Sequence, residues 1–300
     1  MVRVSGGVEG MKKLMAALAL AGVMALSGCG KEEAKQAALA PGGIPNPLRV
    51  ATEGAYPPYN MVDASGNLVG FEIDMMKDVC KRMGTECKFQ AQAWDGMIPA
   101  LQAGHFDAIV AGMSITDERM AAVDFSSGYT TTPAYLVSAN ANPLQDVDYG
   151  IERIDLTEIT PDEQAAIDKI KGLLKGKVLG VQTSTIHANF VDKYLADVVD
   201  IRRYDTQENL ALDLQTGRVE VGLADAITWN AFLQRPEGKD FSYFGPGFDG
   251  GLFGRGQGVA IAKNRPELLG ALNKAIAEMK ADGTMKNLSV QWFGFDSSMP

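Results

Sequence analysis

The chain has 300 residues, of which 46% are hydrophobic and 22% charged, and its mean hydropathy of −0.05 is close to zero. These values describe a soluble globular chain of about two domains. The formal net charge of −9 at pH 7 argues against nucleic acid as a partner, because phosphate backbones are bound by basic surfaces.

The N-terminus has the pattern of an export signal. Lys12 and Lys13 precede an apolar run over residues 14–26 that is too short to span a bilayer comfortably. The run ends in Leu-Ser-Gly-Cys at 26–29, which resembles the bacterial lipobox. We therefore expect a lipoprotein signal peptide over 1–28 and a lipidated Cys29 that anchors the protein to a membrane. A plain cleavage site beside an unmodified cysteine is the alternative.

The segment that follows has no apolar period. Residues 31–47 are rich in Ala, Gly, Pro and Lys/Glu, as expected of a tether between a lipid anchor and a folded domain. We expect residues 29–47 to be flexible and disordered.

From residue 48 onward, strand and helix patterns alternate, and the same kind of unit occurs twice. The sequence predicts an α/β fold, because buried apolar runs of strand length are separated by amphipathic helical segments. The first set comprises strands at 48–52, 86–90 and 107–111 and helices at 71–83 and 97–103. The second comprises strands at 178–182, 199–204 and 219–224 and helices at 186–195 and 208–216.

Two cysteines fall inside the first unit. Cys80 lies at the end of a predicted helix and Cys87 on the following strand, so the pair could form a short disulfide in an oxidising compartment. Metal binding is the weaker alternative, because the only histidines, His105 and His187, are not placed with this pair at zinc spacing. We expect no metal site and no cofactor.

Arg119 is the clearest sign of function. Thr116 is a good N-cap, which puts Arg119 at the third helical position, where a capping box would carry Glu. A cation there is unfavourable by up to about 1 kcal/mol beside the positive end of the helix dipole unless an anion offsets it. A guanidinium suits bidentate binding of a carboxylate, with the Ser114 hydroxyl as a further donor. An ordinary salt bridge to an acid of the same unit is the alternative.

Other polar and aromatic residues follow the predicted strands. Open parallel sheets bind ligands at the carboxyl ends of their strands. In the second unit, hydroxyls that open a helix suit a carboxylate, and an acid at a strand end suits an ammonium. Together they indicate a receptor for a zwitterion. Helix capping and core packing are the alternatives for each residue alone. The residues are Glu53, Tyr56, Trp94, Thr183, Ser184, Thr185 and Asp225.

Five segments, in order along the chain, resemble the periplasmic solute-binding proteins for polar amino acids. Within that family the chain is similar to the lysine/arginine/ornithine-, histidine- and octopine-binding group, and the cysteine pair also matches it. The resemblance covers nearly all of residues 48–298. The segments are ATEGAYPPY (51–59), GFEID (70–74), WDGMIPAL (94–101), SITDER (114–119) and ADGT (281–284).

The resemblance implies a type II periplasmic binding protein, in which two lobes, each a mixed sheet flanked by helices, close a cleft around one ligand. It also implies delivery of that ligand to an ABC permease in the membrane. We expect a monomer with lobe 1 at 48–131 and 252–300 and lobe 2 at 132–251. The hinge would consist of crossings near Thr131–Pro133 and Gly250–Gly251.

Carried over by resemblance, Arg119 would bind the ligand's α-carboxylate, with help from Ser114, Thr185 and the Gly112 backbone. Asp225 would bind the α-ammonium. The distal cation of a basic ligand would meet Glu53. The rings of Tyr56 and Trp94 would enclose the rest of the ligand side chain.

Two departures concern the ligand. Glu53 is one methylene longer than the Asp usual in the lysine/arginine/ornithine group, and Ala111-Gly112 replaces a Ser-Ser pair, so the ligand is expected to be larger or differently held. The stretch 142–175 is long, as in the octopine binders. It contains a strong helix start at Thr160, and we interpret that helix as a lobe decoration.

The leading hypothesis is therefore an extracytoplasmic receptor, in the periplasm or at the cell surface, for a basic amino acid or an opine. A binding protein for a neutral polar amino acid such as glutamine is one alternative. A lyase on the same lobes, similar to prephenate or arogenate dehydratase with Glu53 as general acid, is another. A sensory or channel ectodomain would need a membrane span after the second lobe, and none occurs up to Pro300.

Overall fold

The structure of the chain, a computed structural model, describes residues 38–300. The expected signal peptide, Cys29 and the first part of the tether lie outside the described residues. The described part is a mixed α/β fold with a five-stranded sheet, a six-stranded sheet and two small sheets, as the sequence predicts. Within it, no helix is both long and apolar enough to cross a membrane.

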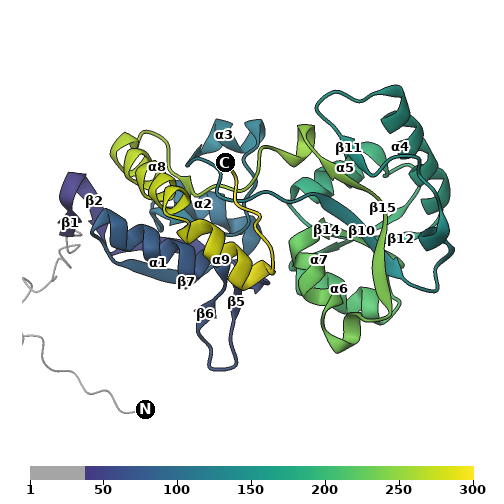
Figure 1. Ribbon diagram of the computed structural model, residues 1–300, viewed down its shortest axis with the longest axis horizontal. Helices are drawn as coiled ribbons and strands as arrows, with labels where there is room; N and C mark the ends of the chain where they lie inside the picture. The colour runs from purple at the N-terminus through teal and green to yellow at the C-terminus, as the bar shows by residue number, and fades with distance from the viewer. Residues whose placement is uncertain (1–37) are drawn as a thin grey trace, which may run out of the picture. The chain divides into compact units, whose positions relative to one another are not determined.

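The expected tether becomes ordered earlier than predicted. Strands β1 (Ala38–Ala40) and β2 (Ile44–Asn46) form an antiparallel pair (Figure 1). Ala40 and Ile44 are buried in the core, and Thr85 donates a hydrogen bond of 2.7 Å to the carbonyl of Pro45. The prediction of disorder is therefore wrong for these residues. Two apolar side chains suffice to dock them, which is too few to produce a periodic pattern.

The first large sheet combines two distant parts of the chain. Its order is β7-β3-β8-β16-β9, with β7, β3 and β8 parallel and β16 antiparallel to both its neighbours. Because β16 lies far along the chain from the other four strands, the sheet depends on the return of the C-terminal segment. The strands are β3 (Leu48–Thr52), β7 (Cys87–Ala91), β8 (Ala108–Ile109), β9 (Asp124–Phe125) and β16 (Ala260–Ile261).

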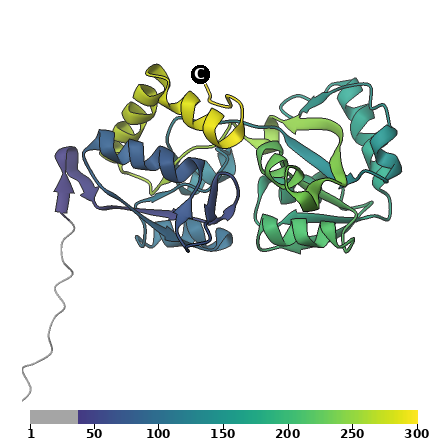
Figure 2. The same cartoon turned by 60° about the horizontal axis from the view of Figure 1, so that its bottom comes forward.

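Helices cover both faces of this sheet. Alternation along β3 sends Val50 into a core with α1 (Phe71–Met83), α8 (Pro266–Ala281) and α9 (Thr284–Phe293), and sends Ala51 into a second core with α2 (Met97–Gln102). Figures 1 and 2 both show α1, α8 and α9 gathered on one side. A small sheet of β4 (Ala55–Tyr56), β5 (Asn60–Val62) and β6 (Leu68–Val69) leads into α1.

The second large sheet has the order β11-β15-β10-β14-β12-β13. Strand β10 is antiparallel to β14 and β15, whereas β12 is parallel to β13 and β14, so the sheet is mixed. The strands are β10 (Ala134–Ala139), β11 (Arg153–Asp155), β12 (Val178–Gln182), β13 (Asp200–Tyr204), β14 (Val221–Asp225) and β15 (Phe241–Asp249).

Each face of this sheet also has its own core. Leu136 packs with α4 (Pro161–Leu174) and α5 (Ile186–Tyr194), and Val137 packs with α6 (Gln207–Gln215) and α7 (Ala226–Leu233). Thr160 and Glu163 form the predicted capping box of α4. However, Ile167 and Ile170 are buried in the core, so interpreting this helix as a decoration is wrong.

The chain passes twice between the two large sheets, over residues 126–133 and 250–259. The two crossings pair with each other, because Gln257 N donates to Thr130 O at 2.8 Å. The predicted crossing positions lie in these segments. Gly250 and Gly251 have φ of 63° and 46°, and a Cβ at either would lie within 2.3 Å of other atoms. Only glycine fits this turn.

Cys80 of α1 and Cys87 of β7 form the predicted disulfide, closing a short loop. We expect Cys80→Ser/Cys87→Ser to lower the free energy of unfolding by about 2.5 kcal/mol on the chain-entropy model. Urea denaturation of the oxidised protein and the double variant measures the difference. Reduced wild-type protein is the control, and its free energy of unfolding should equal that of the double variant. A variant as stable as the oxidised protein would contradict the structural role.

Candidate functional site

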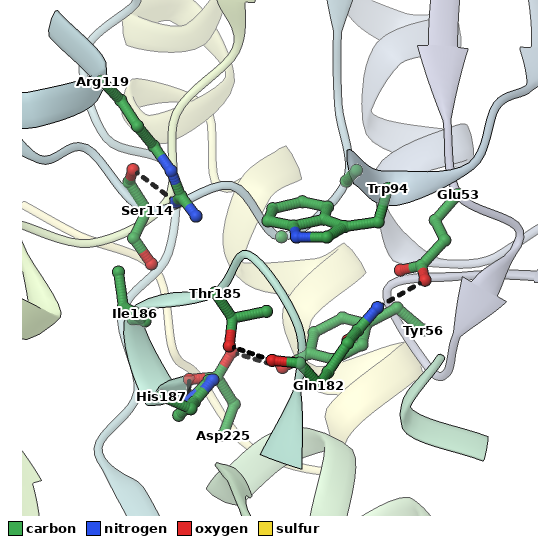
Figure 3. Close-up of a pocket in the computed structure, with 12 residues that line it drawn as sticks. Glu53, Tyr56, Trp94, Ser114, Arg119, Gln182, Thr185, Ile186, His187 and Asp225 are labelled. Atoms are coloured by element: carbon green, nitrogen blue, oxygen red, sulfur yellow. Dashed lines mark hydrogen bonds and ion pairs between the residues drawn. The ribbon is translucent and has the colours of Figure 1, made fainter. Parts of the chain in front are cut away.

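One cavity of about 310 Å³ brings most of the predicted site residues together (Figure 3). Most of them lie on segments that follow strands of the two large sheets, as expected for ligand sites of open α/β sheets. Nine predicted residues line it: Glu53, Tyr56, Trp94, Ala111, Gly112, Ser114, Arg119, Thr185 and Asp225. Gln182, Ile186 and His187 line it too and were not singled out from the sequence as site residues.

Arg119 lies in the first turn of α3 (Asp117–Ala122), capped as predicted by Thr116, whose Oγ1 accepts from Arg119 N at 3.2 Å. Its Nη1 donates to the carbonyl of Ser114 at 3.0 Å, and its Cζ lies 5.2 Å from the centre of the Trp94 ring. Burial lowers its pKa to about 10. Among residues 38–300 it forms no ion pair, so the alternative of an internal salt bridge is not observed.

Asp225 ends β14 and is only 3% exposed. It is the N-cap residue of α7, but its side chain makes no capping hydrogen bond, which removes the capping alternative. Instead, Oδ2 accepts a hydrogen bond of 2.7 Å from the Tyr56 hydroxyl. Burial, followed by the charge of Asp225, raises the pKa of Tyr56, which keeps this hydroxyl protonated as a donor. The carboxylate faces the cavity with no salt-bridging Lys or Arg among the described residues.

Glu53 follows β3 and accepts a hydrogen bond of 2.7 Å from Gln182 Nε2. Burial raises its pKa to about 7, opposed by the Gln182 bond and assisted by neighbouring acids including Glu72. A cation beside Glu53 would stabilise its charged form. The site therefore has a cationic group at Arg119 and acidic groups at Asp225 and Glu53.

Aromatic side chains form much of the remaining wall. Tyr56 is buried, and Trp94 lies in a short 3₁₀ helix and donates from Nε1 to the carbonyl of Ser184 at 3.0 Å. Gly112 has φ of 60°, and a Cβ there would lie 3.1 Å from the Tyr56 ring. Gly112 thus leaves space for the tyrosine that binds Asp225.

The hydroxyls at the start of α5 are less available to a ligand than the sequence predicts. Thr185 Oγ1 accepts from Ala188 N at 3.1 Å as the N-cap and donates to the carbonyl of Gln182 at 2.7 Å, so its hydrogen is already in use. Ser184 has φ of 57° and does not line the cavity; only its carbonyl contacts Trp94. Thr185 therefore caps α5, as in the alternative interpretation, and also lines the cavity.

Glu72, which the sequence did not mark as a site residue, supports the cavity from behind. It is fully buried in α1, and its Oε1 accepts from Gly112 N at 2.7 Å and from the Tyr129 hydroxyl. Its Oε2 accepts from Asn60 Nδ2 at 2.8 Å, and Asn60 Oδ1 accepts from Gly54 N at 2.7 Å. Burial raises the pKa of Glu72, while these donors stabilise its charge.

The direction of this network is fixed by backbone groups at both ends. Gly54 N and Gly112 N can only donate, so Asn60 must turn its NH₂ toward Glu72, and Glu72 must accept on both oxygens. The network holds the chain after β3 and the chain after β8 in place. It also uses the Gly112 N–H, which leaves that group unavailable to a ligand in this conformation.

No group of three or more His, Cys, Asp or Glu side chains in the described chain is arranged to hold a metal ion. The chemistry of the cavity is that of charge pairing, hydrogen bonding and aromatic contact.

Comparison with known proteins identifies the family. Residues 48–295 match the family model described as bacterial extracellular solute-binding proteins, family 3. The chain belongs to this family. The histidine-binding periplasmic protein of Salmonella typhimurium is 35% identical over 289 residues, covering 95% of this chain and 98% of that protein. The octopine-binding periplasmic protein of Rhizobium meliloti is 36% identical over 267 residues, covering 83% and 90%.

The structure of an ancestral arginine-binding protein bound to arginine matches this family 3 protein with a TM-score of 0.69 and 32% identity, covering 83% of this chain and 99% of that one. The predicted family and fold are thereby confirmed. These relatives are named as binding proteins and not as enzymes, which counts against the lyase hypothesis.

The Glu72 network generates a prediction. Glu72→Gln places an NH₂ group against either Asn60 Nδ2 or Gly112 N, so one buried donor loses its acceptor. We expect the free energy of unfolding to fall by about 1–3 kcal/mol in urea denaturation. Glu158→Gln, at an exposed position, is the control and should change it by less than about 0.5 kcal/mol. Equal stability of the two variants would contradict the network.

Proposed function

We propose that this family 3 protein is the extracytoplasmic binding lipoprotein of an ABC importer and that it binds a basic L-amino acid or a related opine. The observation that carries the proposal is Arg119, a guanidinium facing the cavity without a carboxylate partner among the described residues. An anionic ligand group supplies that partner, bound bidentately as guanidinium geometry favours.

Asp225 supports a zwitterionic ligand. It lines the same cavity as Arg119, and an ammonium beside its carboxylate would offset its buried charge. A ligand with a carboxylate and an ammonium on one carbon matches this pair of opposite charges. The α-amino acid group is therefore the chemistry we assign to the Arg119 and Asp225 side of the cavity.

Glu53 supports a basic side chain on the ligand. Burial raises the pKa of Glu53 to about 7, and a guanidinium or ammonium on the ligand would stabilise its charged form. Trp94 and Tyr56 offer aromatic surface for the ligand's stem and cation. The histidine-, octopine- and arginine-binding relatives agree with this choice.

One observation favours the second candidate, a neutral polar amino acid such as glutamine. Glu53 already accepts a hydrogen bond from the carboxamide of Gln182, so a carboxamide on the ligand is also a suitable donor to Glu53. A protonated Glu53 would remove the need for a cation. The two candidates therefore differ in the charge state of Glu53.

The family and the N-terminal pattern support the proposed cellular setting. Residues 1–28 are the proposed lipoprotein signal peptide, and Cys29 is the proposed lipidated residue that anchors the protein to a membrane. The relatives are named periplasmic proteins, and the disulfide suits an oxidising compartment. We propose that a monomer, located in the periplasm or at the cell surface, delivers its ligand to a membrane permease by closing lobe 2 (132–251) against lobe 1 (48–131 and 252–300).

The decisive measurement is the thermal shift of the chain from Lys31 onward against amino acids, octopine and nopaline. A ligand at 100 times its Kd adds about 2.7 kcal/mol to stability. We expect arginine, lysine, ornithine, histidine or an opine to give the shift, and Arg119→Ala to weaken binding by at least about 30-fold, since it removes one partner of a buried charge pair.

Arg203→Ala removes an exposed arginine that pairs with Asp192, and serves as the matched control with unchanged affinity. A shift produced only by acidic ligands would overturn the basic-ligand proposal. No shift with any of these compounds would overturn amino-acid and opine binding itself.

Glu53 generates a second prediction, tested with arginine because its side chain stays charged. Binding a cation lowers the raised pKa of Glu53 and so releases a proton. Arginine affinity should therefore be constant above about pH 7 and fall by up to about 10-fold per pH unit below it, as Trp fluorescence titrations from pH 5.5 to 8.5 would show.

Glu53→Gln should remove most of this pH dependence and weaken arginine binding more than glutamine binding at pH 8. Equal losses of affinity for arginine and glutamine would count against a role of Glu53 in cation selectivity and favour the neutral-ligand candidate.

A further inference from the structure

His187 is a buried histidine in the wall of the cavity. It is the second residue of α5, after the N-cap Thr185, and is 5% exposed. Its ring packs against Phe253 with the ring centres 5.8 Å apart. Yet its Nε2 is buried with no hydrogen-bond partner in the described chain. Buried polar atoms are nearly always paired, so this nitrogen needs an explanation.

The carboxylate of Asp225 lies close to this nitrogen. His187 Nε2 lies 3.4 Å from Asp225 Oδ1, but the geometry does not make a hydrogen bond. Asp225 Oδ2 is occupied by the Tyr56 hydroxyl, whereas Oδ1 accepts no hydrogen bond from residues 38–300. Figure 3 shows His187 and Asp225 together at one end of the cavity. Two unsatisfied polar atoms therefore face the same space.

A group with two N–H bonds satisfies both atoms at once. One N–H donates to Asp225 Oδ1, and the other donates to His187 Nε2, which requires a neutral imidazole with its proton on Nδ1. We propose that His187 is a ligand-binding residue that accepts a hydrogen bond from the ligand's α-ammonium beside Asp225. This inference rests on the proposed amino-acid function and adds a requirement for at least two N–H bonds on the ligand amine.

In the proposed complex His187 accepts a hydrogen bond on Nε2, so its imidazole carries no proton there. The other ionisable side chains lining its cavity are Glu53, Tyr56, Arg119 and Asp225, and Asp225 Oδ1 lies 3.4 Å from the imidazole Nε2. An imidazolium would stand beside the ligand's ammonium and at the positive end of the α5 dipole. With the ammonium bound to Asp225, a neutral acceptor is the compatible state. Free α-amino acids and secondary-amine opines meet the N–H requirement, and tertiary amines do not.

The first test compares two ligands on two proteins. His187→Phe keeps a ring against Phe253 and removes the acceptor. We expect it to weaken arginine binding by about 10- to 100-fold, as for a lost hydrogen bond to a charged group. Argininic acid has a hydroxyl in place of the α-ammonium and so offers one hydrogen, which Asp225 takes. For this analogue, measured by competition, the variant should change the Kd by less than about 3-fold.

An equal loss of affinity for both ligands would show that His187 has a merely structural role, and this would overturn the inference. Unchanged arginine affinity in the variant would overturn it too. A wild-type protein that binds no amino acid or opine would overturn the proposed function instead, so the two failures are distinguishable.

The second test observes the imidazole directly. The chain has two histidines, so ¹⁵N-histidine labelling with His105→Gln as the assignment control isolates the His187 signals. In the arginine complex we expect a neutral ring with a proton on Nδ1 and a bare, hydrogen-bonded Nε2. An imidazolium or a protonated Nε2 in that complex would overturn the inference even if His187→Phe weakens binding.

Discussion

The cavity is built around a buried cation, Arg119, that has no salt-bridging carboxylate in the described part of the chain. Arg119 is placed in the first turn of α3 by the Thr116 cap, where the helix dipole disfavours positive charge, and burial lowers its pKa to about 10. Among residues 38–300, its guanidinium donates to the carbonyl of Ser114 and lies over the face of Trp94, and it forms no ion pair. A buried charge without a partner costs stability, and the proposed anionic group of the ligand would offset that cost.

One of the two acids comes from the other large sheet. Glu53 follows β3 of the five-stranded sheet, the unit to which α3 and Arg119 also belong, whereas Asp225 ends β14 of the six-stranded sheet and binds the Tyr56 hydroxyl. A ligand that joins these groups links both sheets. The two crossings, which pair through Thr130 and Gln257, connect the sheets covalently. The proposed closure of the two lobes around the ligand would take place about these crossings.

The Glu72 network explains why the loops around the cavity have defined positions. A single buried carboxylate fixes the residues after β3 through Asn60, and those after β8 through Gly112. Tyr129, in the first crossing, binds the same carboxylate. The wall of the cavity and the crossing are thus linked through one acceptor, and the glycine at 112 admits the Tyr56 ring.

Local sequence by itself determined the helix starts at Thr116 and Thr160, several strand positions and the misplaced charge of Arg119, because capping and periodicity act over a few residues. Strand ends marked most of the cavity-wall residues, and family resemblance added the two-lobe fold and the expected role of each residue. The places of Glu72, Gln182 and His187 were decided only by the tertiary structure. Each is an ordinary polar residue in its own segment, and it gains its role from partners up to 129 positions away, as when Gln182 meets Glu53. Such pairings leave no local signal, since they arise only when folding brings distant segments of the chain together.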